Sequence, residues 1–324
     1  MPATTHTRAT ALAAALLLAT GGALAQAWPA KPVRMVSPYP PGGTNDVTGR
    51  IVAERLQARL GQAFIVENKP GANTNIASEF IAKATPDGYT LYWVAAPFTV
   101  NPSLFAKVPY DARRDFAPVA HTVMLPVLLS VPAASSARTV REFLDLARAK
   151  PDAGTVGTPG NGSGPHLALE QLIGASGAPL AHVPYKGDAP AVNDLVGGRL
   201  GGGMNAFGTP LPHVKSGKLR ALAVVATARM PQLPEVPTFA ETGFPQVDAY
   251  AWFGLLAPAG TPAPILERLN AEVNAVLKSP EVAERFALLG AVPLGGSAAD
   301  FEKFIRADLD KWARIVRERN IKPD

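Results

Sequence analysis

Apolar residues along the first third of the chain fall into two patterns. Short continuous or alternating apolar runs are typical of β-strands, and apolar residues recurring every three or four positions are typical of amphipathic helices. The predicted strands are residues 33–37, 64–67 and 90–95, and the predicted helices are 46–60 and 76–84. This βαβαβ order predicts an α/β unit with a parallel sheet covered by helices on both faces.

The same rhythm returns in the middle of the chain. Thr139 precedes Glu142 by three positions, a spacing that indicates a capped helix start. The predicted helices are 139–150, 164–177 and 189–196, and the predicted strands are 155–158, 181–185 and 219–226. The last of these strands is continuously apolar, as expected when helices cover both of its faces. The sequence therefore predicts two α/β units in tandem.

The end of the chain follows a different pattern, with one strand-like run and then helices alone. The strand is 250–257, and the helices are 264–278, 281–289 and 298–320. Because a helical tail builds no sheet of its own, we expect it to pack back on the first unit and make that unit discontinuous. Two long apolar connections, 116–131 and 247–257, would then cross between the units as hinge strands. The expected lobes are 26–125 with 251–324, and 126–250.

The N-terminal residues 1–25 have the form of a secretory signal peptide. Arg8 is followed by an apolar run too short to span a membrane and then by the small-residue site Ala23-Leu24-Ala25. We expect export to the periplasm, with the mature chain starting near Gln26 or Trp28. The absence of cysteine excludes disulfides and thiolate chemistry. The net charge of +5 is not gathered into a basic run, so no nucleic-acid partner is expected.

Motifs for catalysis, cofactors and metals are absent or incomplete. Ser163 lies one place away from the position that a nucleophile elbow requires, no Walker loop occurs, and Pro165 stands where a dinucleotide fingerprint needs glycine. His166 and Glu170 are four residues apart on a predicted helix, but such a pair is more often a simple neighbour contact than a metal site. We expect no catalytic residue, no cofactor and no metal.

Two glycine-rich loops are the remaining candidates for a site. Residues 40–46 join the first strand to the first helix, and residues 160–164 join a strand to a helix in the second unit. Both loops are expected at the carboxyl edge of a sheet, where open α/β folds bind ligands. Each offers main-chain N–H groups and a helix N-terminus, which suit an anion. Facing each other across a cleft, they could clamp a small carboxylate without Arg or Lys.

From about Trp28 to its end, the sequence resembles a known family: the solute-binding receptors of tripartite tricarboxylate transporters, the Bug/TctC type. The matching stretches are PYPPGG at 38–43, VENKPGA at 66–72, PDGYTL at 86–91, NPSL at 101–104, HVPYKG at 182–187, GKLRALA at 217–223 and WFGLLAPAGTP at 252–262. The resemblance implies a two-lobed, type II-like periplasmic binding protein fold. It further implies a receptor for a small carboxylate, a transient partnership with membrane subunits, and a monomer.

In this family, main-chain groups and waters hold the ligand carboxylates. The residues that the resemblance implicates here are Gly42, Gly43, Thr44 and Asp46 in the first lobe and Gly162, Ser163 and His166 in the second. Tyr39, Ala96, Tyr185 and Asn205 complete the expected ligand contacts.

Two departures from the family pattern bear on the ligand. The loop after the third strand reads Ala95-Ala96-Pro97-Phe98 where the family is often rich in Gly, Thr and Ser, and Asn205 stands where the family often has aspartate. Both indicate a less polar pocket, less suited to an amino group and suited to a carboxylate with an apolar or aromatic body. Phe98 and Phe207 either contact that body or pack in the core, and Trp252 either faces the cleft or packs.

Two other functions remain open at this stage. The chain could report ligand occupancy to a signalling partner, a role that the sequence does not separate from transport. An exported α/β hydrolase is supported only by Ser163 beside His166, without an acid placed to complete a triad.

Overall fold

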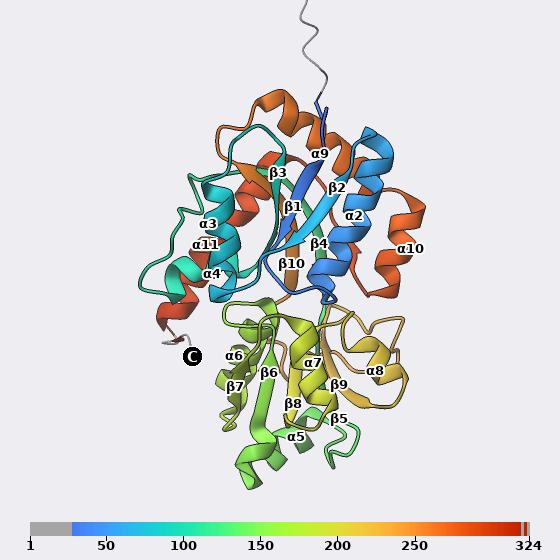
Figure 1. The fold of residues 1–324 in the computed structure, drawn as a ribbon. Helices are drawn as coiled ribbons and strands as arrows, with labels where there is room; N and C mark the ends of the chain where they lie inside the picture. Colours follow the sequence, from blue (N-terminus) through green and yellow to red (C-terminus); the bar gives the residue numbers. More distant parts are fainter. Residues whose placement is uncertain (1–27, 319–320, 323–324) are drawn as a thin grey trace, which may run out of the picture.

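The structure is a computed structural model, and it describes residues 28–318 and 321–322. The expected signal peptide at 1–25 lies outside the described residues. Two mixed β-sheets, each covered by helices, are stacked end to end in Figure 1. This is the expected α/β periplasmic binding protein fold, with a parallel group of strands at one side of each sheet and a helical tail.

The first sheet has six strands in the order β11-β4-β10-β3-β1-β2. Its strands are β1 (Val33–Ser37), β2 (Phe64–Asn68), β3 (Thr90–Ala95), β4 (Phe116–Leu125), β10 (Ala251–Pro258) and β11 (Val292–Pro293). β1 pairs in parallel with β2 and β3, whereas β10 runs antiparallel to β3 and β4. The sequence pattern predicted the parallel unit but gave no direction for β10.

The second sheet has five strands in the order β7-β6-β8-β5-β9. Its strands are β5 (Val127–Pro132), β6 (Thr155–Thr158), β7 (Ala181–Pro184), β8 (Gly202–Ala206) and β9 (Leu219–Val225). β6 pairs in parallel with β7 and β8, and β5 is antiparallel to β8 and β9. Pro126 alone separates β4 of the first sheet from β5 of the second, so one apolar connection passes directly between the sheets, as expected.

The helices cover both faces of each sheet. They are α2 (Thr44–Leu60), α3 (Asn75–Ala82), α4 (Pro97–Leu104), α5 (Val140–Ala149), α6 (Gly164–Ser176), α7 (Asp188–Val196), α8 (Leu211–Lys215), α9 (Ala263–Leu277), α10 (Pro280–Leu288) and α11 (Ala298–Glu318). Two short 3₁₀ turns, Ala72–Thr74 and Pro151–Gly154, complete the set.

β3 shows why the central strands are apolar throughout. Leu91 and Trp93 pack in a cluster with α2, α9 and α10, whereas Tyr92 and Val94 pack in a second cluster with α3, α4 and α11. Because successive side chains of a strand point to opposite faces, a sheet covered on both sides needs apolar residues at every position.

The helical tail returns to the first sheet, as expected. Phe301, Ile305 and Leu309 of α11 pack on the face that carries Tyr92. Trp312 and Val316, near the end of the same helix, join a cluster that also contains residues of the second lobe. The strands divide between the two sheets in a way that supports lobe limits of 26–125 with 251–324, and 126–250, which we retain as a proposal.

Candidate functional site

The site lies between the two sheets, at the ends of their parallel strands. Helices α2 and α4 of the first lobe and α6 and α7 of the second all begin there, each after a strand of its own sheet. A cavity at this place is lined from both lobes. Its lining residues are Tyr39, Ala95, Ala96, Pro97, Pro159, Ser163, Gly164, Pro165, Asp188, Ala206, Ala251, Trp252 and Phe253.

The cavity is small. Its volume of about 20 Å³ suits roughly one water molecule. An adjoining groove of about 430 Å³ shares Tyr39 and Pro159 with it and runs along the junction of the lobes past Asn73 and Tyr185. The lobes are therefore closed on each other, and a ligand larger than water requires them to separate or their side chains to shift.

Direct contacts hold this closed arrangement. The hydroxyls of Thr44 and Thr209 lie 2.7 Å apart across the junction. Asn73 donates from its amide to the Asn161 carbonyl oxygen at 2.7 Å. Gly43 is close enough to the start of α7 that a Cβ there would lie 3.8 Å from the main-chain nitrogen of Ala189. These contacts join elements of different sheets and exist only while the lobes are together.

Three of the four converging helices have no side-chain cap. Gly43, Ala96 and Gly187 precede α2, α4 and α7, and none of them has a side chain that bonds the first-turn N–H groups. α6 differs, because Ser163 accepts from the main-chain N–H of His166 at 3.2 Å. Helix N-termini carry partial positive charge, so their convergence favours an anion.

No described lining residue carries a cationic side chain, and Asp188 contributes a carboxyl group. Asp188 is 7 % exposed and is the first residue of α7. Its Oδ1 accepts from the Ala206 N–H at 2.9 Å and from Asn205 Nδ2 at 3.3 Å. Burial raises the pKa of Asp188 to about 7, against the opposing effect of these two bonds.

Tyr39 faces the same carboxyl from the loop between β1 and α2. Burial, and then the proximity of Asp188, raise the pKa of the Tyr39 hydroxyl above its usual value. Tyr39 is therefore a neutral donor or acceptor at the edge of the cavity throughout the physiological range.

Of the predicted contacts, Tyr39, Ala96 and Ser163 line the cavity, and Gly43 and Thr44 lie at the closing surface beside it. Gly42 and Asp46 are hydrogen-bonded to each other and do not line the cavity. The Asp46 carboxylate accepts from the Gly42 N–H at 3.0 Å, from Asn68 at 2.8 Å and from Arg50 at 2.9–3.0 Å. These groups lower the pKa of Asp46 against its burial and fix the loop, so this carboxylate is not aimed at the cavity.

Phe98 and Phe207, which the sequence left open between ligand contact and core packing, are buried and do not line the cavity in this closed structure. Phe98 stacks on Tyr110 at 5.4 Å and meets Phe116 edge-on at 4.8 Å. Phe207 packs with Leu128 and Leu211. Tyr185 donates to Asp194 at 2.7 Å and lines the outer groove, while Asn205 reaches the site only through Asp188.

Ser163 and His166 do not form a catalytic pair. The ring nitrogen Nδ1 of His166 accepts from the Gly162 N–H at 3.0 Å, and the ring stacks on His182 at 4.2 Å. Since Ser163 bonds the main chain of His166 and not its ring, the arrangement is a helix cap. The only support for a hydrolase is thereby removed, and Gly162 and His166 serve to shape the loop.

Asp188 and Trp252 are the lining residues of most chemical interest that the sequence did not assign. Trp252 was left open between cleft and packing; it lines the cavity and also packs edge-on against His121 at 5.6 Å. Asp188 directly follows Gly187, which ends the loop from β7 to α7. The same strand-to-helix rule that identified residues 40–46 and 160–164 would have found it.

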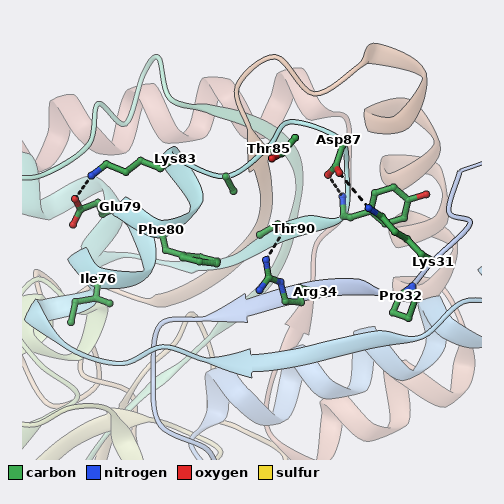
Figure 2. Close-up of a pocket in the computed structure, with 12 residues that line it drawn as sticks. Lys31, Pro32, Arg34, Ile76, Glu79, Phe80, Lys83, Thr85, Asp87 and Thr90 are labelled. Carbon is green, nitrogen blue, oxygen red and sulfur yellow. Dashed lines mark hydrogen bonds and ion pairs between the residues drawn. The ribbon is translucent and has the colours of Figure 1, made fainter.

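A larger groove of about 750 Å³ lies on the outside of the first lobe (Figure 2). Its cations have acidic partners: Lys31 lies 3.7 Å from Asp87, Lys83 lies 2.5 Å from Glu79, and Arg34 lies 3.6 Å from Glu67. Because these charges are neutralised locally, the groove is a poorer anion site than the interlobe cavity.

Within residues 28–318 and 321–322, no cluster of three or more potential metal ligands occurs. His166 Nε2 lies 3.6 Å from Glu170 as a neighbour on one helix. Among the helices of this described part, none is long and apolar enough to cross a membrane.

The chain is similar to known solute-binding receptors. The model of the "Tripartite tricarboxylate transporter family receptor" matches residues 48–321. Protein BugT of Bordetella pertussis is 36 % identical over 313 residues, which cover 95 % of this chain and 96 % of BugT. These matches span both lobes.

Two solved structures show the same arrangement with ligands. A protein of R. palustris solved with adipate is 34 % identical with a TM-score of 0.88, covering 92 % of this chain and all of that one. MatC of Rhodopseudomonas palustris, with bound malate, is 30 % identical with a TM-score of 0.84, covering 89 % of this chain and all of that one.

Proposed function

The chain belongs to the family of tripartite tricarboxylate transporter receptors, and on this premise we propose that it captures a small carboxylate in the cavity between its lobes. It is a solute-binding receptor and not an enzyme. The observation that carries the proposal is the convergence of the N-termini of α4, α6 and α7, from two lobes, on one cavity beside the start of α2, with no cationic side chain among the described lining residues.

Capture proceeds by closure of the lobes. A carboxylate docks on the main-chain donors of one lobe, and the other lobe then swings in around the connections at Pro126 and before β10. The ligand favours the closed form only to the extent that it binds it more tightly than the open form. Removal of water strengthens the contacts with the N–H groups.

The body of the ligand is apolar, because most of the lining is. Ala96, Pro97, Pro159, Pro165 and Trp252 surround the cavity. Neither Phe98 nor Phe207, the aromatic side chains considered from the sequence, lines the cavity. We retain a carboxylate with an aliphatic or aromatic body as the proposed ligand.

The receptor works in the periplasm as a monomer, after removal of the signal peptide, and meets its membrane subunits transiently. Support comes from the family, whose receptors work with tripartite transporters. Relatives solved with adipate and with malate support a carboxylate as the cargo.

The test is a thermal-shift screen of mature protein that has been unfolded and refolded to remove carried ligand. The panel contains aliphatic dicarboxylates, citrate, acidic amino acids and aromatic acids. A ligand at 100 times its Kd stabilises the protein by about 2.7 kcal/mol, or several degrees in Tm. A shift with an aliphatic or aromatic acid supports the proposal, and no shift with any carboxylate would overturn it.

A further inference from the structure

Asp188 presents a problem for a receptor of anions. Its carboxyl lines the cavity in which a ligand carboxylate is proposed to bind, and it is almost fully buried. Two like charges in contact repel each other more strongly in a partly desolvated site than in water. No described residue of the lining supplies a cation to compensate.

The described surroundings of Asp188 offer no other counter-charge, because Lys186, two positions before it, lines the outer groove and not the cavity. From the loop before α2, Tyr39 is the facing titratable group, and the carboxylate of Asp46 is already held by Arg50 and Asn68. β8 contributes only the neutral groups of Asn205 and Ala206. β5 and β6 are the remaining strands that pack on α7, and neither contains an ionisable side chain.

The hydrogen bonds leave one carboxyl oxygen for the ligand. Both described donors, Asn205 Nδ2 and the Ala206 N–H, end at Oδ1. Oδ2, which accepts neither of these bonds, is therefore the oxygen available to carry a proton, on a side chain that lines the cavity. A buried carboxylic acid that donates a hydrogen bond to an anion removes the repulsion and replaces it with a charge-assisted bond.

We propose that Asp188 is a ligand-contacting specificity residue that donates a hydrogen bond from a protonated Oδ2 to the captured carboxylate, so that binding takes up a proton and disfavours ligands with an ammonium group nearby. This inference rests on the proposed function of the cleft. It assigns the ligand class more narrowly, to carboxylates that lack an α-amino group.

The position of Asp188 on its titration curve fits this role. With a pKa of about 7 in the unliganded cavity, the side chain is half protonated at neutral pH. An anion placed beside it raises the pKa further, because the nearby charge disfavours ionisation. Affinity then falls about tenfold between pH 6 and pH 8, because the protonated fraction falls by that factor.

Matched pairs of ligands test the inference. Calorimetric titrations of the mature protein with glutarate and glutamate, and with succinate and aspartate, are made at pH 6 and pH 8 in two buffers of different ionisation enthalpy. We expect the amino-free acid to bind more tightly than its partner, about tenfold more weakly at pH 8 than at pH 6, and with close to one proton taken up at pH 8.

Variants separate Asp188 from the titration of the ligand itself. Asp188→Asn keeps the shape and supplies a permanent N–H donor, so its affinity for the diacid should be equal at the two pH values. Asp145→Asn removes an exposed carboxylate paired with Arg148 in the same lobe and should keep the wild-type pH dependence.

The outcomes are distinct. Equal diacid affinity of the wild type at the two pH values, no proton uptake, or tighter binding of the amino acids would overturn the role of Asp188 and leave the receptor intact. Binding of no carboxylate at either pH would overturn the proposed function with it. The proton count of the wild type decides the question even if Asp188→Asn does not fold.

Discussion

Thr44 and Thr209 are 165 positions apart, yet their hydroxyls share a hydrogen bond of 2.7 Å across the junction of the lobes. Thr44 opens α2 of the first lobe, and Thr209 lies in the turn after β8 of the second. The bond exists only when the lobes are closed. It therefore contributes to ligand affinity through the closed state.

Thr209→Val removes this hydroxyl and preserves the shape of the side chain. The loss of one hydrogen bond costs about 1 kcal/mol, so we expect carboxylate affinity to fall about fivefold. Titration calorimetry measures the change, and Thr209→Ser, which keeps the hydroxyl, serves as the control. An unchanged affinity in Thr209→Val would show that this contact does not support closure.

Asp188 should make stability depend on pH in an unusual direction. Its pKa of about 7 in the folded protein lies above its value in the unfolded chain, near 4. Between these values the folded state holds more protons, so stability falls as pH rises from about 4 to 7, by at most about 1.4 kcal/mol per pH unit.

Replacement by asparagine should remove this component. Asp188→Asn is expected to gain Tm over the wild type at pH 8 and to match it at pH 4. Thermal melts across this range measure the difference, with Asp145→Asn as the control. A Tm difference that does not vary with pH contradicts the assignment.

His121 should produce the opposite dependence. Burial lowers its pKa to about 4, and its ring packs against Phe304 at 4.2 Å and Trp252 at 5.6 Å. Because the unfolded chain binds the proton more readily, stability falls as pH drops from about 6.5 to 4. His121→Gln should remove this loss, so its Tm should gain on that of the wild type as pH falls through that window, whereas the Tm difference of His213→Gln on α8 should not vary with pH.

Gly164 opens α6 where no side chain fits. A Cβ at this position would lie 2.0 Å from the carbonyl oxygen of Tyr250 and 2.7 Å from the nitrogen of Ala251. Alanine normally favours a helix, but overpacking against backbone costs about 1–3 kcal/mol. We expect Gly164→Ala to lower Tm by several degrees, and a melt with unchanged or higher Tm would refute the close approach.

The sequence predicted those parts of the fold that follow from a local period. The helix expected at 46–60 is α2 (Thr44–Leu60), and the helical tail packs on the first sheet as expected. α4 was missed because Pro97 and Pro102 interrupt its apolar period. β8 was missed because Gly202 and Gly203 lower its strand signal.

The position of the site could be predicted from the sequence, but the full set of residues that line it could not. The rule that ligands bind at the carboxyl edges of strands placed the loops of Gly43 and Ser163 where the cavity lies. It does not give the direction of a side chain, so the sequence left Phe98 open between ligand contact and core packing, and the structure shows it packed on Tyr110. Asp188 became a candidate only from the structure, because its raised pKa comes from burial and it lines a cavity formed by both lobes.

The most direct test of capture between the lobes places a large side chain at Gly43, where it would prevent the lobes from closing. Its φ of −79° and ψ of 167° accept any residue, and a Cβ there would lie 3.8 Å from the nearest atom of α7, so Gly43→Ala should leave Tm unchanged. A leucine at this position fills the junction and holds the lobes apart without disturbing either core.

The measurement is a calorimetric titration of wild type, Gly43→Ala and Gly43→Leu with the carboxylate that gives the largest thermal shift. We predict one bound ligand per wild-type chain, and an affinity at least tenfold lower in Gly43→Leu at unchanged Tm. Equal affinity in the wild type and Gly43→Leu would contradict capture between the lobes.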